Sequence, residues 1–160
     1  MIAAVVAAAA LVLTSDDLRP GATMPRVLMA TQCGGSNRKP ALHWANVPAG
    51  VRSFALVERD PDAPVPGGFY HWVVYDVPAT ARSLDGSPAA KTGTSTTGHA
   101  AYYGPCPPPG QRHHYVFTLY ALDVASVGGS APLTGAQLEA ALRGHVVARA
   151  TLEATAATAE

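Results

Sequence analysis

The chain has 160 residues, a length typical of one domain with a single hydrophobic core. Hydrophobic residues make up 48% of it and charged residues 14%, which argues against a disordered chain. The formal net charge is zero, whereas non-specific nucleic-acid binding and attachment to anionic lipid both need a basic surface. We therefore expect a folded domain over residues 1–160 without a nucleic-acid partner.

An apolar, Ala-rich run occupies residues 1–13. It is shorter than the roughly 20 residues that cross a bilayer, so no stable membrane insertion is predicted. It also lacks the basic start and the cleavage site of a typical signal peptide. We predict that residues 1–10 are an extension of uncertain role, that the run ends in a strand, and that the protein is cytoplasmic. Export through this apolar segment is the alternative.

Fourteen Pro and fifteen Gly separate short apolar runs, which favours a β-rich fold with many turns. After the N-terminal strand, further strands are predicted over residues 25–33, 41–44, 51–60, 69–78, 113–124 and 146–154. One helix is predicted over 133–145, because Thr134 is a suitable N-cap and Gln137 follows it by three residues. Residues 80–100 are small and polar without periodicity, which predicts a long loop.

Carboxylates and histidines lie near the ends of three predicted strands. Asp60 and Asp62 are two residues apart at the end of one strand, so in extended backbone they would point the same way. His71 begins the returning strand and would face them if the two strands pair. His113 and Tyr115 share a face of a later strand. These five residues predict a common pocket, provided that the three strands converge.

Several chemistries suit such a set of residues. It could bind an anion through imidazole and backbone N–H groups, with the carboxylates fixing the histidine tautomers. It could also transfer protons as an acid/base pair. A metal site is less favoured, because no HxH, HxxxH or CxxC spacing occurs, and no cofactor is predicted. The structural alternative is that Asp60 accepts turn hydrogen bonds and the histidines are merely packed.

Two cysteines, Cys33 and Cys106, cannot form a disulfide framework or a zinc ligand set by themselves. They could form one bridge or remain two thiols. No GxSxG nucleophile motif is present. Cys106 lies between prolines and precedes two histidines, but a cysteine in such a loop is more often inert or bridged than catalytic.

Three motifs occur in the chain in a characteristic order. They are DPDAP at 60–64, HWVVYDVPA at 71–79, and GPCPPPG at 104–110 followed by HHYVFTLYALD at 113–123. Together they resemble the phosphatidylethanolamine-binding protein family, and its bacterial and archaeal branch most closely. The resemblance extends over about residues 11–155.

This resemblance implies a mainly β fold of two antiparallel sheets with Greek-key connections and a few short helices. It further implies a small pocket for an anionic ligand such as phosphate, phosphoethanolamine or a carboxylate group, no cofactor, and a homodimer. By motif position, the ligand-binding residues would be Asp60, Asp62, Ala63, Pro64, His71, Gly104, Cys106, Pro107, Pro108, His113 and Tyr115.

The chain departs from the family pattern close to these positions. His114 replaces the usual Arg, which removes a permanent charge, and Lys39 replaces a usual Ser. Thr97 and Ala101 stand where an aromatic residue and Gly are common, so the rim of the pocket is expected to differ. Cys33 and Cys106 fall where bacterial members often carry Cys, which favours a bridge.

Three functions remain open at this point. The first hypothesis is a binding protein for a small anion. The second is a lyase, isomerase or cyclase that uses Asp60, His71 and His113 as catalytic acid/base groups. The third, regulation of a partner protein such as a kinase or protease, comes from other branches of the family.

Overall fold

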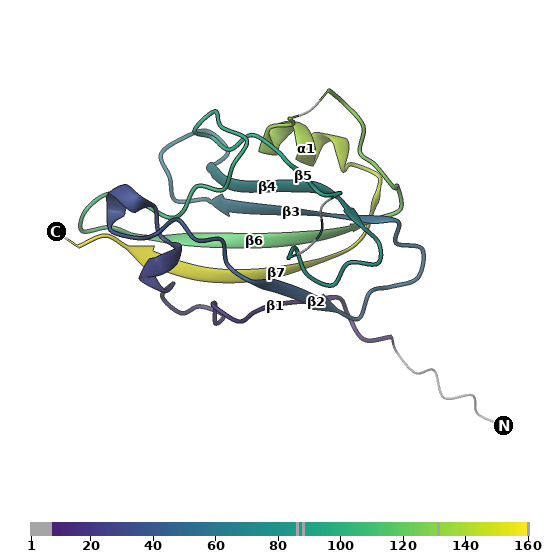
Figure 1. Ribbon diagram of the computed structural model, residues 1–160, viewed down its shortest axis with the longest axis horizontal. Coiled ribbons are helices and arrows are strands. Elements are labelled where there is room, and N and C mark those ends of the chain that lie inside the picture. Colours follow the sequence, from purple (N-terminus) through teal and green to yellow (C-terminus); the bar gives the residue numbers. More distant parts are fainter. Residues whose placement is uncertain (1–7, 86, 88, 131, 160) are drawn as a thin grey trace.

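Two antiparallel sheets form the framework of the chain (Figure 1). The computed structural model describes residues 8–159 apart from 86, 88 and 131. The small sheet pairs β1 (Val12–Ser15) with β2 (Leu42–Ala45). The large sheet has the order β5–β4–β3–β6–β7. Its strands are β3 (Ser53–Asp60), β4 (Phe69–Pro78), β5 (Lys91–Thr92), β6 (Arg112–Leu122) and β7 (Val146–Ala157).

The large sheet contains the Greek-key connection that the resemblance implies. β3, β4 and β5 follow one another as antiparallel neighbours, and β6 then returns to lie beside β3. Four strands in this spatial order define a Greek key. The expected fold class is therefore confirmed. As a result, β3 lies at the centre of the sheet, where its end contacts both β4 and β6.

Strand alternation divides the core between the two faces of the large sheet. One face packs against the small sheet and includes Phe54, Leu56 and Phe117 together with Trp44 of β2. The other face carries smaller and β-branched side chains such as Val57, and it is covered by the helix α1 (Gly135–Ala141). Because residues of one strand point to opposite faces in turn, the residues of β3 alternate between these two cores.

The predicted helix is present, but it is shorter than expected. Thr134 caps it: its side chain accepts from the Gln137 backbone N–H, and the Gln137 side chain accepts from the Thr134 N–H. This reciprocal pair is the capping box that the sequence predicted. Leu138 and Leu142 are buried against the large sheet. The chain then turns at Gly144, whose φ of 80° favours glycine, before β7 begins.

The predicted strand over residues 25–33 is wrong. This segment forms two short 3-10 helices, η1 (Arg26–Leu28) and η2 (Thr31–Cys33). Leu28, Met29 and Ala30 are buried one after another, so the segment has no alternating face. An apolar run without a period of two does not distinguish a strand from compact turns.

The structure describes only the later part of the apolar N-terminal run, from residue 8 onward. Leu11 and Leu13 are buried and the strand begins at Val12, which confirms that the run ends in a strand. Residues 1–7, most of the predicted extension 1–10, lie outside the described residues. Within the described part of the chain, no helix is long and apolar enough to cross a membrane.

The predicted loop over 80–100 contains the short strand β5.

Candidate ligand-binding site

A cavity of about 180 Å³ lies where β3 ends and where β4 and β6 begin. Its lining consists of Asp60, Ala63, Pro64, Phe69, His71, Tyr103, Cys106, Pro107, Pro108, His113 and Tyr115. Of the eleven residues predicted to bind a ligand, all except Asp62 and Gly104 are therefore brought together around one cavity. Phe69 and Tyr103 were not predicted.

A β-bulge directs His71 into this cavity. Glu58 of β3 pairs with Trp72, but the next residue pairs with Tyr70, so His71 is an extra residue in β4. Trp72 belongs to the core beneath the small sheet, whereas Tyr70 packs on the α1 face. The extra residue restarts the alternation, and His71 lies on the same side as Trp72, with its ring 5.1 Å from that of Tyr115.

The imidazole of His71 is held in one tautomer. Its Nδ1 lies 2.6 Å from the backbone carbonyl of Tyr103, which can only accept a hydrogen bond. The N–H is therefore on Nδ1. His71 is 4% exposed, and this burial lowers its pKa to about 4, against the opposing effects of the Tyr103 carbonyl and the Asp60 charge. The side chain is neutral at neutral pH.

Asp60 and His113 form a buried pair in the wall of the cavity. Asp60 Oδ2 lies 2.7 Å from His113 Nδ1, and His113 Nε2 lies 3.1 Å from Gln111 Oε1. Asp60 Oδ1 also accepts the backbone N–H groups of Asp62 and Ala63, at 2.8 and 3.1 Å. Asp60 therefore closes the turn, as the structural alternative held, and in addition it orients His113.

Asp62 does not share the direction of Asp60. The turn that Asp60 closes rotates Asp62 away from the cavity, and its Oδ2 accepts from the backbone N–H of His114 at 2.8 Å. The same oxygen lies 2.7 Å from His114 Nδ1. This contact lowers the pKa of Asp62 and raises the pKa of His114. The expectation from extended backbone fails here because the strand ends at Asp60.

Gly104 supports the cavity from behind. Its N–H donates to Asn37 Oδ1 at 2.7 Å, and a Cβ at this position would clash with the backbone carbonyl of Leu28. A glycine is required at this close approach of two backbone segments. Gly104 therefore positions the loop that carries Tyr103 and Cys106.

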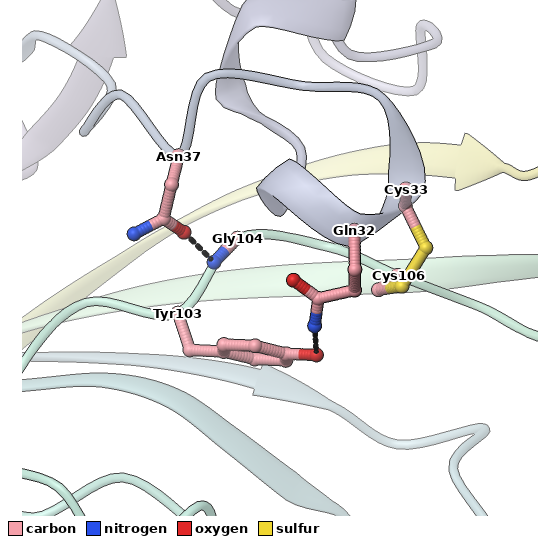
Figure 2. The surroundings of a disulfide bond; sticks show 6 residues. All are labelled: Gln32, Cys33, Asn37, Tyr103, Gly104 and Cys106. Carbon is pink, nitrogen blue, oxygen red and sulfur yellow. Dashed lines mark hydrogen bonds between the residues drawn. A yellow bond between two sulfur atoms is a disulfide. The ribbon is translucent and has the colours of Figure 1, made fainter.

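A disulfide between Cys33 and Cys106 fixes the same loop (Figure 2). The bond joins η2 to the wall of the cavity, with the two Cα atoms 5.6 Å apart. Next to it, the Gln32 side-chain amide donates to the Tyr103 hydroxyl. We call the loop that carries Tyr103 and Cys106 the cavity loop. Residues 26–38 are called the bracing segment, because they hold the cavity loop through the disulfide, Gln32 and Asn37. The bridge that the sequence left open is present.

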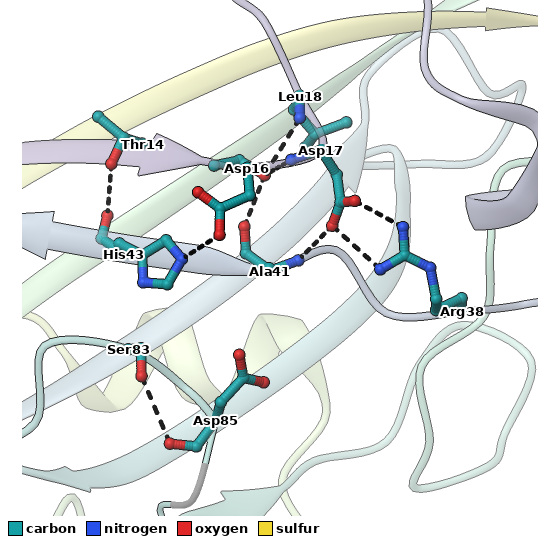
Figure 3. A network of polar contacts seen from close by, with 10 residues as sticks. Thr14, Asp16, Asp17, Leu18, Arg38, Ala41, His43, Ser83 and Asp85 are labelled. Carbon is teal, nitrogen blue, oxygen red and sulfur yellow. Dashed lines mark hydrogen bonds and ion pairs between the residues drawn. The ribbon is translucent and has the colours of Figure 1, made fainter.

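The bracing segment is in turn tied to the small sheet (Figure 3). The Arg38 guanidinium contacts both carboxylate oxygens of Asp17, at 2.5 and 3.2 Å, and Asp17 also accepts the Ala41 N–H at 2.7 Å. The Arg38 hydrogen bond lowers the pKa of Asp17. Nearby, His43 Nε2 lies 3.0 Å from Asp16 Oδ2. Polar contacts therefore connect the residues next to β1 and β2 to Arg38 of the bracing segment.

One of the two lining residues that were not predicted has a local signal in the sequence. Phe69 precedes His71 by two residues in the same predicted strand, so a period of two alone places both side chains on one face. Tyr103 lies in a loop, and its position depends on contacts with Gln32 and His71 that no local pattern indicates.

Comparisons with known proteins agree with this architecture. The family model described as "Phosphatidylethanolamine-binding protein" matches residues 14–157. The protein YbhB of Escherichia coli is 37% identical over 153 residues, which cover 89% of this chain and 97% of YbhB. LppC of Mycobacterium tuberculosis, which is named as a lipoprotein, is 41% identical over 123 residues, or 74% of this chain and 59% of LppC.

A solved structure is similar over almost the whole chain. The crystal structure of E. coli YbcL, described as a new member of the mammalian PEBP family, superposes with a TM-score of 0.87 at 30% sequence identity. The superposition covers 93% of this chain and 99% of YbcL. The chain belongs to the phosphatidylethanolamine-binding protein family.

Proposed function

We propose that this protein binds a small molecule through an anionic phosphate or carboxylate group, phosphoethanolamine included. The observation that carries the proposal is the convergence of His71 and the Asp60–His113 pair on one small, aromatic-walled cavity. Membership in a family named for phosphatidylethanolamine binding supports the same class of ligand.

The donors for such an anion are few. Pro107 and Pro108 have no N–H, and the Gly104 N–H is used by Asn37, so the loop supplies fewer backbone donors than the sequence predicted. The Tyr115 hydroxyl is buried without a partner among the described residues. The Tyr103 hydroxyl accepts from Gln32 and can donate its own hydrogen. These two hydroxyl groups are the side-chain donors that we expect at an oxyanion.

Histidine NMR signals test this proposal directly. Titration with inorganic phosphate, O-phosphoethanolamine and acetate in turn should shift the ring signals of His71 and His113 with at least one of these anions, while the exposed His43 stays unchanged. His71→Ala should weaken binding about tenfold or more, because one hydrogen bond to a charged group contributes roughly 1.5–3 kcal/mol. His43→Ala is the matched control. Unchanged affinity in a folded His71→Ala variant would contradict the assignment.

Acid/base catalysis is a second candidate, supported by the buried carboxylate–imidazole pair. Asp60 and His113 are 3% and 5% exposed, and such a pair can move a proton at a bound substrate. A screen of small carbonyl compounds should then detect turnover that is lost in Asp60→Asn while the fold persists. Equal turnover in Asp60→Asn would exclude this role for the pair. Regulation of a kinase or protease stays a prediction.

A further inference from the structure

The free nitrogen of His71 is a hydrogen-bond acceptor. Its Nδ1–H is donated to the Tyr103 carbonyl, which leaves the lone pair on Nε2. Nε2 has no hydrogen-bond partner among the described residues, and the imidazole lines the cavity. A ligand atom that approaches Nε2 must therefore bring a hydrogen.

The other groups around His71 do not supply a free positive charge. From β3 it faces the Asp60 carboxylate, whose partner is His113 on β6. Tyr115 of β6 and Tyr103 of the cavity loop contribute uncharged hydroxyl groups. No Lys or Arg is among the described residues that line the cavity. An anion without a proton would meet an acceptor nitrogen and a carboxylate.

We propose that the cavity selects anions that carry a proton of their own, above all phosphate monoesters in their singly charged form, whose P–O–H group donates to His71 Nε2. This inference rests on the proposed function and names the chemical class of its ligand. The remaining phosphoryl oxygens would then accept from the Tyr103 and Tyr115 hydroxyl groups. Fully ionised anions of the same shape, such as sulfate monoesters, would be excluded.

The preference follows from the cost of supplying the missing proton. A sulfate monoester can bind in the same position only if His71 is protonated first. Burial holds the pKa of His71 at about 4, so at about pH 5.5 protonation of this side chain costs more than tenfold in affinity. A phosphate monoester avoids this cost below its second pKa of about 6, because it then carries the proton itself.

Methyl phosphate and methyl sulfate test the inference, because near pH 5.5 they have nearly the same shape and mostly the same charge and differ in one O–H group. Calorimetry on the whole chain should show methyl phosphate binding at least about tenfold more tightly at this pH. Near pH 8 methyl phosphate has lost the proton, and the preference should shrink. In His71→Gln the amide can turn to donate, so the preference should disappear, whereas His43→Gln should retain it.

The outcomes separate this inference from the function on which it rests. Equal or tighter binding of methyl sulfate by the wild-type protein near pH 5.5 would overturn the inference and leave anion binding intact. Binding of neither compound, nor of inorganic phosphate, would overturn both. If His71→Gln does not fold, nitrogen NMR of wild-type His71 decides: Nε2 should stay unprotonated in the methyl phosphate complex, and a proton on Nε2 would contradict the inference.

Discussion

Glu58 lies two residues before Asp60 on the same side of β3, yet it is fully buried and does not line the cavity. Neither carboxylate oxygen has a hydrogen-bond partner among the described residues. Burial, and to a smaller degree the charge of Asp60, raises the pKa of Glu58 well above its ordinary value. The side chain is therefore kept as the neutral acid to an unusually high pH.

Replacement of Glu58 should make stability less dependent on pH. The folded protein holds the Glu58 proton over a pH range in which the unfolded chain, with a carboxyl pKa of about 4.3, has already lost it. Stability therefore falls as the pH rises from this value toward the raised pKa. We expect Glu58→Gln to be more stable than wild type by over about 1 kcal/mol near pH 8, and similar to it near pH 4.

Urea unfolding at the two pH values measures this difference. Glu153→Gln is the control, because Glu153 is exposed on β7 and should change stability little at either pH. If Glu58→Gln and wild type differ by the same amount at both pH values, the buried carboxyl does not titrate as described.

The sequence predicted most of the cavity, and its failures have physical reasons. Asp60, His71 and His113 line one cavity as predicted, because all three lie near the ends of strands that meet at one edge of the sheet. Asp62 was placed wrongly because the turn at Asp60 could not be seen in the pattern. The bulge that orients His71 was also not visible, since it depends on the pairing of β3 with β4.

The bracing segment and the cavity loop depend on each other for their positions. The disulfide connects residues that are 73 positions apart, and a cross-link of this length removes much of the entropy of the unfolded chain. Two further contacts, from Gln32 and Asn37, act on the same loop. The loop has little regular structure, so these links determine its position.

Loss of the disulfide should lower the free energy of unfolding and the affinity of the cavity for its ligand. The double variant Cys33→Ala/Cys106→Ala should lose about 4 kcal/mol of unfolding free energy on the chain-entropy estimate, within a usual range of roughly 2–5 kcal/mol. Ligand affinity should fall as well, because the loop that carries Tyr103 loses its covalent link to the bracing segment. Denaturant unfolding with and without reductant provides the measurement. Reductant should lower the midpoint of wild type toward that of the variant and leave the variant unchanged; an unaffected wild type would contradict the prediction.

The elements differ in how well the sequence predicted them. β4 was predicted with its observed bounds, because a Gly-Gly turn and a proline bracket a run of β-branched and aromatic residues. The first part of the bracing segment falls within the predicted strand 25–33, and that prediction is wrong because its apolar residues support tight turns against the cavity loop. Its conformation is set by partners more than 60 positions away, such as Tyr102, whose hydroxyl donates to the Leu28 carbonyl at 2.9 Å.

The disulfide bears on the cellular compartment in which the protein folds. Structural disulfides persist in oxidising environments and are rare in the cytosol. The cytoplasmic location and the homodimer stay predictions, and the bond between Cys33 and Cys106 argues against the first.

Thiol titration should reveal the effect of the compartment. Protein directed to an oxidising compartment should react with no thiol reagent after denaturation, because Cys33 and Cys106 are the two cysteines of the chain. Protein made in a reducing cytosol should expose two reactive thiols and unfold at lower denaturant concentration. Two free thiols in the exported protein would show that the bond does not form under oxidising conditions.

The same bond gives the chain a closed ring that contains β2, β3, β4 and β5. Residues 96–101 are exposed and lie within this ring. A protease that cuts there would leave two pieces that remain one covalent molecule, and they would separate on a denaturing gel only after reduction. The cavity would therefore keep its covalent connection to the bracing segment after such a cut, whereas a cut before Cys33 or after Cys106 would release a fragment held only by non-covalent contacts.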